Sequence, residues 1–179
     1  MGHLIFSGSE DSVTTLEVDD SKFTGATLIS SGIVDVNGVQ VFGPGVVTMT
    51  GGAIRVTQVG TTIADYFMMG GTIGLGSLTS ISSSIALAGN AFITPSENSR
   101  GSIWSGALAL DGFTLSTSDP DPNIDCGAWT DEALTISGVI SGSGGVTQGS
   151  LGSLVLTGDD TIQGPPPSMR APLTLAVQI

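Results

Sequence analysis

Short stretches in which apolar and small polar residues alternate recur along the chain, and glycines separate them. The clearest series lies near the C-terminal end, where three apolar runs cover residues 134–140, 145–147 and 151–157. The runs are short and rich in Val, Ile, Leu and Thr, and their two-residue period is that of a β-strand rather than a helix. The pattern therefore predicts short strands joined by tight corners.

Glycine supplies the predicted corners, because it adopts positive φ angles at little steric cost. A short strand, a corner and another short strand describe one coil of a solenoid, and stacked coils pair strand on strand at about 4.8 Å. The sequence thus predicts an all-β fold, a right-handed parallel β-solenoid (β-helix). The expected corners of the clearest series are Gly142, Gly144, Gly145, Gly149, Gly152 and Gly158.

The same series resembles the autotransporter-associated β-strand repeat. The matching positions are Ile136 to Gly145, followed by Gly149, Leu151, Leu154, Leu156 and Gly158. With the upstream strings SISSSIALAGNAFIT and LALDGFTLS, the resemblance covers roughly residues 79–164. It implies a β-helix in an exported surface protein, an adhesin or a scaffold that displays one, and it implies no catalytic residues.

One signal in the first 60 residues favours a different arrangement. Asn37 and Gly38 lie between alternating valines, and Asn-Gly in that setting is a strong signal for an antiparallel hairpin. An antiparallel β-sandwich or barrel is therefore the alternative fold, especially in this region. In a solenoid the same dipeptide would form a corner.

The chain divides into three expected parts. Residues 1–24, with several acids, are predicted to form an N-terminal cap or arm. Residues 25–164 are predicted to form the solenoid body, from which a loop at 117–132 protrudes, because two prolines there forbid regular pairing. Residues 165–179 are predicted to be a Pro-rich spacer and a terminal strand, which is placed to pair with a neighbouring chain.

The composition excludes several classes of partner. The formal net charge is −12, from 16 acids and four scattered bases, so neither nucleic acid nor an anionic membrane surface is an expected ligand. No export signal and no apolar run of about 20 residues is visible, which favours a route such as release inside a virus particle. The lone Cys126 cannot form an intrachain disulfide. The four bases are Lys22, Arg55, Arg100 and Arg170.

The predicted loop contains the only pattern that suggests a metal. Asp119, Asp121, Asn123 and Asp125 alternate as the first ligands of an EF-hand do. The pattern then fails, since Ile124 stands where that loop needs glycine. A solvated acidic loop is the favoured interpretation, and a calcium site is the alternative; no other cofactor is expected.

No catalytic triad is expected, because the only histidine is His3. Glycoside hydrolysis needs only two carboxylates about 5–9 Å apart, and Asp65, Asp111, Glu97 or the acids at 119–125 are the candidates. Trp104, Trp129 and Tyr66 are the aromatic residues that would line such a cleft. The bulky string DYFMM at 65–69 is interpreted as core or as a subunit contact.

These observations predict a non-enzymatic structural protein. The first hypothesis is a component of the virion surface, such as a capsid decoration, cement or fibre protein. The alternative is a fragment of a bacterial adhesin passenger on the cell surface, and a polysaccharide-cleaving spike ranks third. The expected partners are protein subunits, in a homo-oligomer for which a trimer is the first guess, and a host surface glycan.

Overall fold

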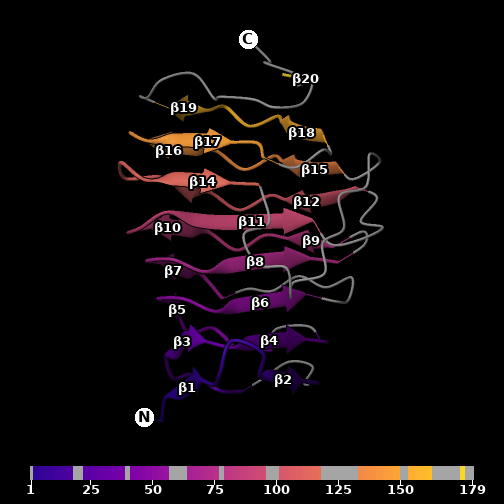
Figure 1. Cartoon of the computed structure of the whole chain (residues 1–179). Coiled ribbons are helices and arrows are strands. Elements are labelled where there is room, and N and C mark those ends of the chain that lie inside the picture. The colour runs from indigo at the N-terminus through magenta and orange to yellow at the C-terminus, as the bar shows by residue number, and fades with distance from the viewer. Residues whose placement is uncertain are drawn as a thin grey trace.

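A computed structural model shows the chain as a stack of short parallel strands, without helix among the residues it describes. Those residues are 2–17, 22–38, 41–56, 64–76, 79–95, 101–117, 133–149 and 153–162, together with the backbone of 174–175. In Figure 1, β1 lies at one end of the stack and β19 near the other, and the chain ascends coil by coil between them. The predicted parallel β-solenoid is confirmed.

Three sheets run along the stack, and we name them A, B and C. Sheet A has eight strands, in the order β1 (Leu4–Ser7), β3 (Thr27–Ser31), β5 (Val47–Met49), β7 (Tyr66–Met68), β10 (Ile85–Leu87), β13 (Leu108–Ala109), β16 (Ile140–Gly142) and β19 (Thr161–Ile162).

Sheets B and C complete the coils. Sheet B has seven strands: β2 (Val13–Leu16), β4 (Ile33–Val36), β6 (Ala53–Val56), β8 (Thr72–Leu75), β11 (Ala91–Pro95), β14 (Thr114–Ser116) and β17 (Gly145–Thr147). Among the described residues, sheet C has five strands, the first of them in the fourth coil: β9 (Ser80–Ile81), β12 (Ser102–Trp104), β15 (Ala133–Ile136), β18 (Ser153–Leu156) and β20 (Thr174–Leu175).

The antiparallel alternative for the first 60 residues is wrong. β4 pairs in parallel with β2 on one side and with β6 on the other. Asn37 follows β4 directly, and its backbone N–H donates to the carbonyl of Leu16 in the coil below at 2.9 Å. The Asn-Gly dipeptide therefore lies at a corner, because the partner of each strand is a strand one coil away rather than the next strand in the chain.

Coil length is nearly constant except at one insertion. Twenty residues separate Thr27 from its partner Val47, and 19 separate Val47 from Tyr66. Between Leu108 and its partner Ile140 the chain advances 32 residues. The predicted loop at 117–132 occupies this longer coil; only its first residue, Thr117, lies within the described residues, and it is buried.

Close approach between coils explains the glycines that precede three strands of sheet A. Gly106, Gly138 and Gly158 occupy equivalent positions in successive coils. A Cβ at Gly138 would collide with the carbonyl oxygen of Gly106, and one at Gly158 would collide with that of Gly138. This corner divides the run at 134–140, predicted as one strand, between β15 and the first residue of β16.

Rows of apolar side chains fill the interior, one row for each inward position of a sheet. In sheet C the inward row is Ile81, Trp104, Ile136 and Leu156, each 4% exposed or less. Each fully buried aliphatic side chain contributes about 1.5–3 kcal/mol to folding. The inward rows form one continuous cluster, and Ile33 with Ala53 forms a small separate one.

The ends of the chain join the stack as its outermost strands. Residues 1–24, predicted as a cap or arm, supply β1 and β2, which are the last strands of sheets A and B. At the other end β20 pairs in parallel with β18 of the same chain. The rest of 165–179 lies outside the described residues.

Candidate functional site

The predicted calcium ligands cannot be placed. Asp119, Asp121, Asn123 and Asp125 lie outside the described residues, and so do Glu97, Cys126 and Trp129. Among the residues that are described, no group of three or more His, Cys, Asp or Glu side chains is arranged to hold a metal ion. The calcium site stays a prediction.

The two described candidate carboxylates lie at different corners. Asp65 precedes β7, whereas Asp111 follows β13, which is two strands further along sheet A. A strand spacing of about 4.8 Å and a rise of about 3.3 Å per residue separate them by on the order of 15 Å. That distance exceeds the range that glycosidases use. Asp65 instead accepts a hydrogen bond from the backbone N–H of Ser84 at 3.0 Å.

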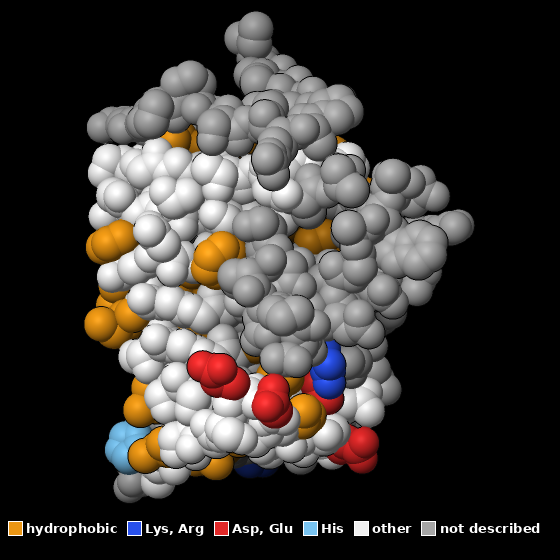
Figure 2. Space-filling view, in the orientation of Figure 1, with side chains coloured by type: hydrophobic (Ala, Val, Ile, Leu, Met, Phe, Trp, Pro, Cys, Tyr) orange, Lys and Arg blue, Asp and Glu red, His pale blue; other side chains and the backbone are white. Residues whose placement is uncertain are grey.

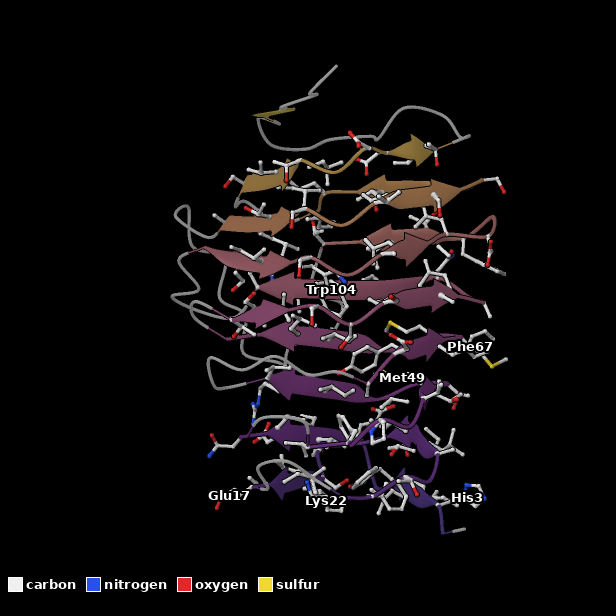
Figure 3. The ribbon with its side chains drawn as sticks, turned by 180° about the vertical axis from the view of Figure 1, so that it is seen from behind. His3, Glu17, Lys22, Met49, Phe67 and Trp104 are labelled. Atoms are coloured by element: carbon white, nitrogen blue, oxygen red, sulfur yellow. The ribbon has the colours of Figure 1, made fainter. Side chains whose placement is uncertain are left out.

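Two of the aromatic residues predicted to line a glycan cleft are buried. Trp104 is 0% exposed and Tyr66 is 2% exposed. Their ring centroids lie 6.1 Å apart with the planes tilted by 57°, a favourable edge-on contact inside the core. Figure 3 shows Trp104 within the stack. The expectation that these rings are available to a sugar is therefore wrong, because both face inward on their strands.

A small hollow lies beside the first two coils. It has a volume of about 270 Å³ and is lined by hydroxyl groups, glycines and apolar side chains, without a charged residue. Two of the hydroxyls already have partners: Ser12 donates to the carbonyl of Ser9, and Ser31 donates to that of Gly8, both at 2.7 Å. The hollow offers few free polar groups to a ligand.

The outer face of sheet A carries most of the exposed large apolar side chains of the described residues. Its central outward row runs through all eight strands without a charged side chain: Ile5, Leu28, Thr48, Phe67, Ala86, Ala109, Ser141 and Thr161. Phe67 is 39% exposed, and Figure 3 shows it projecting away from the stack. We refer to this row and its flanking outward residues as the sheet A face.

The string DYFMM shows how the face arises. Tyr66 and Met68 point inward and are buried, whereas Phe67 and Met69 point outward and remain 39% and 52% exposed. The string was predicted to be core or a subunit contact. Alternate side chains belong to the core and to the surface, because successive residues of a strand point to opposite sides. In this strand the outward positions are large and apolar as well as the inward ones. Such an unbroken apolar run is the sequence signal that could have revealed the sheet A face.

Charged groups lie elsewhere on the stack. On the outer side of sheet B, Arg55 forms a bidentate ion pair with Asp35 of the coil below, at 2.6 and 2.7 Å. On the face that Figure 2 draws, the visible charged side chains lie near the N-terminal end of the stack, and apolar side chains are visible along one flank.

One acid near the C-terminal end is held in an unfavourable environment. The Asp160 side chain accepts a hydrogen bond from the backbone N–H of Ile140 at 2.9 Å. Partial burial raises the pKa of Asp160 above the ordinary value of 3.8, the hydrogen bond opposes this, and the neighbouring Asp159 adds to the increase. The group is a structural acceptor between two coils.

No family model, curated protein or solved structure matches the chain. Within the described ranges, no helix is long and apolar enough to cross a membrane. The fold and the surface define a parallel β-solenoid with an apolar core and with most of its exposed large apolar side chains, among the described residues, on the outer side of sheet A.

Proposed function

We propose that the protein is a non-enzymatic structural protein of the virion surface, such as a capsid decoration, cement or fibre protein. The observation that carries the proposal is the sheet A face, an uncharged and partly apolar row that follows the whole stack. A rigid stack with such a face is suited to packing against other protein subunits, because exposed apolar patches mark interaction surfaces.

The interior gives no support to catalysis. Among the described residues, the buried polar ones are all uncharged: Thr27, Thr72, Thr79, Ser83, Thr94, Ser102, Thr117 and Gln148. Catalytic sites need titratable groups whose pKa values are adjusted to their task. Among the described carboxyls, Asp160 has a raised pKa, and its hydrogen bond to the backbone gives it a structural role.

A fragment of a bacterial adhesin passenger is the second candidate. The repeat resemblance at 79–164 favours it, and that part of the chain contributes strands to all three sheets, from β9 to β19. The repetitive outer rows would then display a binding surface for a host glycan. A polysaccharide-cleaving spike is less well supported, because the two described aromatic candidates are buried and the two described carboxylates are far apart.

Immunogold electron microscopy would separate these proposals. Antibodies raised against the purified chain would be applied to the source culture, intact and after lysis. Label on particles supports the virion proposal, whereas label on the envelope of intact cells supports the adhesin. Label confined to the cell interior would contradict both. Release of reducing ends from capsular or cell-wall polysaccharide by the purified chain would instead establish the spike.

A further inference from the structure

Large exposed apolar side chains concentrate on one side of the solenoid. Seven are exposed among the described residues, and five of them belong to sheet A, within its outward row or directly beside a strand of that sheet. Three of these, Val46, Phe67 and Met69, lie on or beside the neighbouring strands β5 and β7. The five are Ile5, Val46, Phe67, Met69 and Val139.

We propose that the sheet A face binds the same face of a second copy of this chain, with the two stacks antiparallel and the two-fold axis running along β10. The inference rests on the proposed structural function and names the partner of that surface. Two-fold contacts are isologous, so every residue pair across the interface occurs twice.

The central row is complementary to itself in this arrangement. β7 and β13 are the immediate neighbours of β10 in sheet A, so Phe67 of one copy faces Ala109 of the other. Ala86 lies between them on β10 itself. Each aromatic ring therefore meets a shallow region formed by two alanines, and small side chains opposite a large one let the two sheets approach to about 10 Å.

The exposed valines beside the central row are also related by the same two-fold axis. Val46 directly precedes β5, and Val139 directly precedes β16; both strands lie two positions from β10, on opposite sides. These two exposed valines, 48% and 44% accessible, would cover each other. Two apolar residues that are far apart in one chain are thereby paired by a single symmetry operation.

Side-chain size favours the antiparallel orientation, and charge does not oppose it. The chain carries a net charge of −12, so two acids should not face each other across the interface. Asp65, at the border of the face, would lie opposite Ala107, the residue that precedes β13, and Asp111 would lie opposite Met69. In a parallel arrangement each Phe67 would instead meet Phe67, and the alanines would face each other across a gap.

The area indicates a weak but specific dimer. Seven overlapping strands at about 4.8 Å and three outward positions per strand give a face of roughly 500 Å² per copy. Two copies would bury about 1,000 Å², which is near the lower limit for a specific interface. We therefore expect a monomer–dimer equilibrium that depends on concentration in the micromolar range.

Sedimentation velocity of the full chain over a range of concentrations tests the proposal. We expect a dimer that Phe67→Asp weakens about 100-fold, because each copy would bury an unpaired carboxylate. Ile103→Asp is the matched control: Ile103 is also 39% exposed but points outward from sheet C. It should leave the dimer unchanged. Circular dichroism would confirm that both variants fold.

A second pair of variants tests the geometry. Ala109→Asp should also dissociate the dimer, and Phe67→Lys combined with Ala109→Asp should restore it, because the two new charges would face each other twice. Failure of the combination to restore binding would overturn the assigned axis. The proposed interface would be overturned by a monomer at all concentrations, by a trimer, or by a loss of dimer affinity in Ile103→Asp equal to that in Phe67→Asp. The proposed function would be unaffected by that result, because labelling of particles by antibody tests it separately.

Discussion

β2 and β8 belong to the same sheet but differ in burial. All four residues of β8 are buried, whereas three of the four residues of β2 are exposed and the fourth, Leu16, is half-buried. The two strands are similar in composition, VTTL against TIGL, and both are four residues long. They differ in position: β8 has a strand on either side, and β2 is the last strand of sheet B.

This contrast shows that burial in the solenoid comes from stacking. In the N-terminal coil the inward residue Leu16 stays half-buried because no coil lies beneath it, as expected for repeat proteins whose stability is a sum of neighbouring interfaces. The same substitution should therefore cost more in a middle coil than at an end. Four predictions test or refine this idea.

The largest effect is expected from replacing two leucines of the same inward row by alanine, one in a middle coil and one in the end coil. Leu16 and Leu75 belong to the same row of sheet B, through Val36 and Val56. Leu75→Ala should lower the free energy of unfolding by about 3–4 kcal/mol, because it leaves a closed cavity. Leu16→Ala should cost about 1 kcal/mol. Urea titration of both variants measures the difference, and equal losses would contradict the role of stacking.

Corner glycines should show the next largest effect. Gly138→Ala places a methyl group against the carbonyl oxygen of Gly106 and should cost about 2 kcal/mol or more, because backbone must move. Gly145→Ala is the control, since a Cβ there meets nothing within 4 Å. It should change stability by about 0.5 kcal/mol at most. Thermal melting compares the two; a tolerated Gly138→Ala would show that the coils can separate.

A smaller effect is expected from the ion pair on sheet B. Asp35→Asn removes the charge from the pair with Arg55, whose side chains are 28% (Arg55) and 16% (Asp35) exposed. Partly exposed pairs contribute about 0.5–1 kcal/mol, and salt screens them. The loss should shrink in 1 M salt, for which the Debye length is about 3 Å. A loss that is independent of salt would indicate packing instead of charge.

The smallest effect concerns Asp160 and depends on pH. Because its pKa is raised in the folded state, the fold favours the protonated form, and stability from this group falls as pH rises above 3.8. Asp160→Asn keeps an acceptor for the N–H of Ile140 and removes the charge. Its melting temperature should exceed that of the parent chain at pH 7, and the difference should vanish toward pH 3.8. A lower melting temperature at pH 7 would contradict the assigned cause.

The sequence predicted the architecture because the solenoid repeats a local rule. Alternation with period two and glycine at corners sufficed to identify the parallel β-solenoid and to locate β17 correctly. The register was not predictable, since it depends on which coil each strand contacts. Asn37-Gly38 illustrates this: the dipeptide has the local chemistry of a hairpin, but the strand it follows pairs with strands one coil away.

The surface was less predictable than the core. Alternation shows that neighbouring residues face opposite sides, yet it does not say which side is inside when both are apolar. Ile103 and Trp104 are adjacent, and only the pairing of β12 with β9 and β15 shows that Trp104 faces the core. The sheet A face was missed for the same reason, because Phe67 and Met69 are as hydrophobic as the buried residues beside them.

Amide hydrogen exchange, read by mass spectrometry along the whole chain, tests the central claim most directly. If stacking on both sides creates the stability, exchange should be slowest in the middle strands, from β7 to β14. It should accelerate toward β1 and β2 at one end and toward β19 at the other. Exchange in β1 and β2 as slow as in β8 would contradict this account, because it would show that the end coil is stable without a neighbour beneath it.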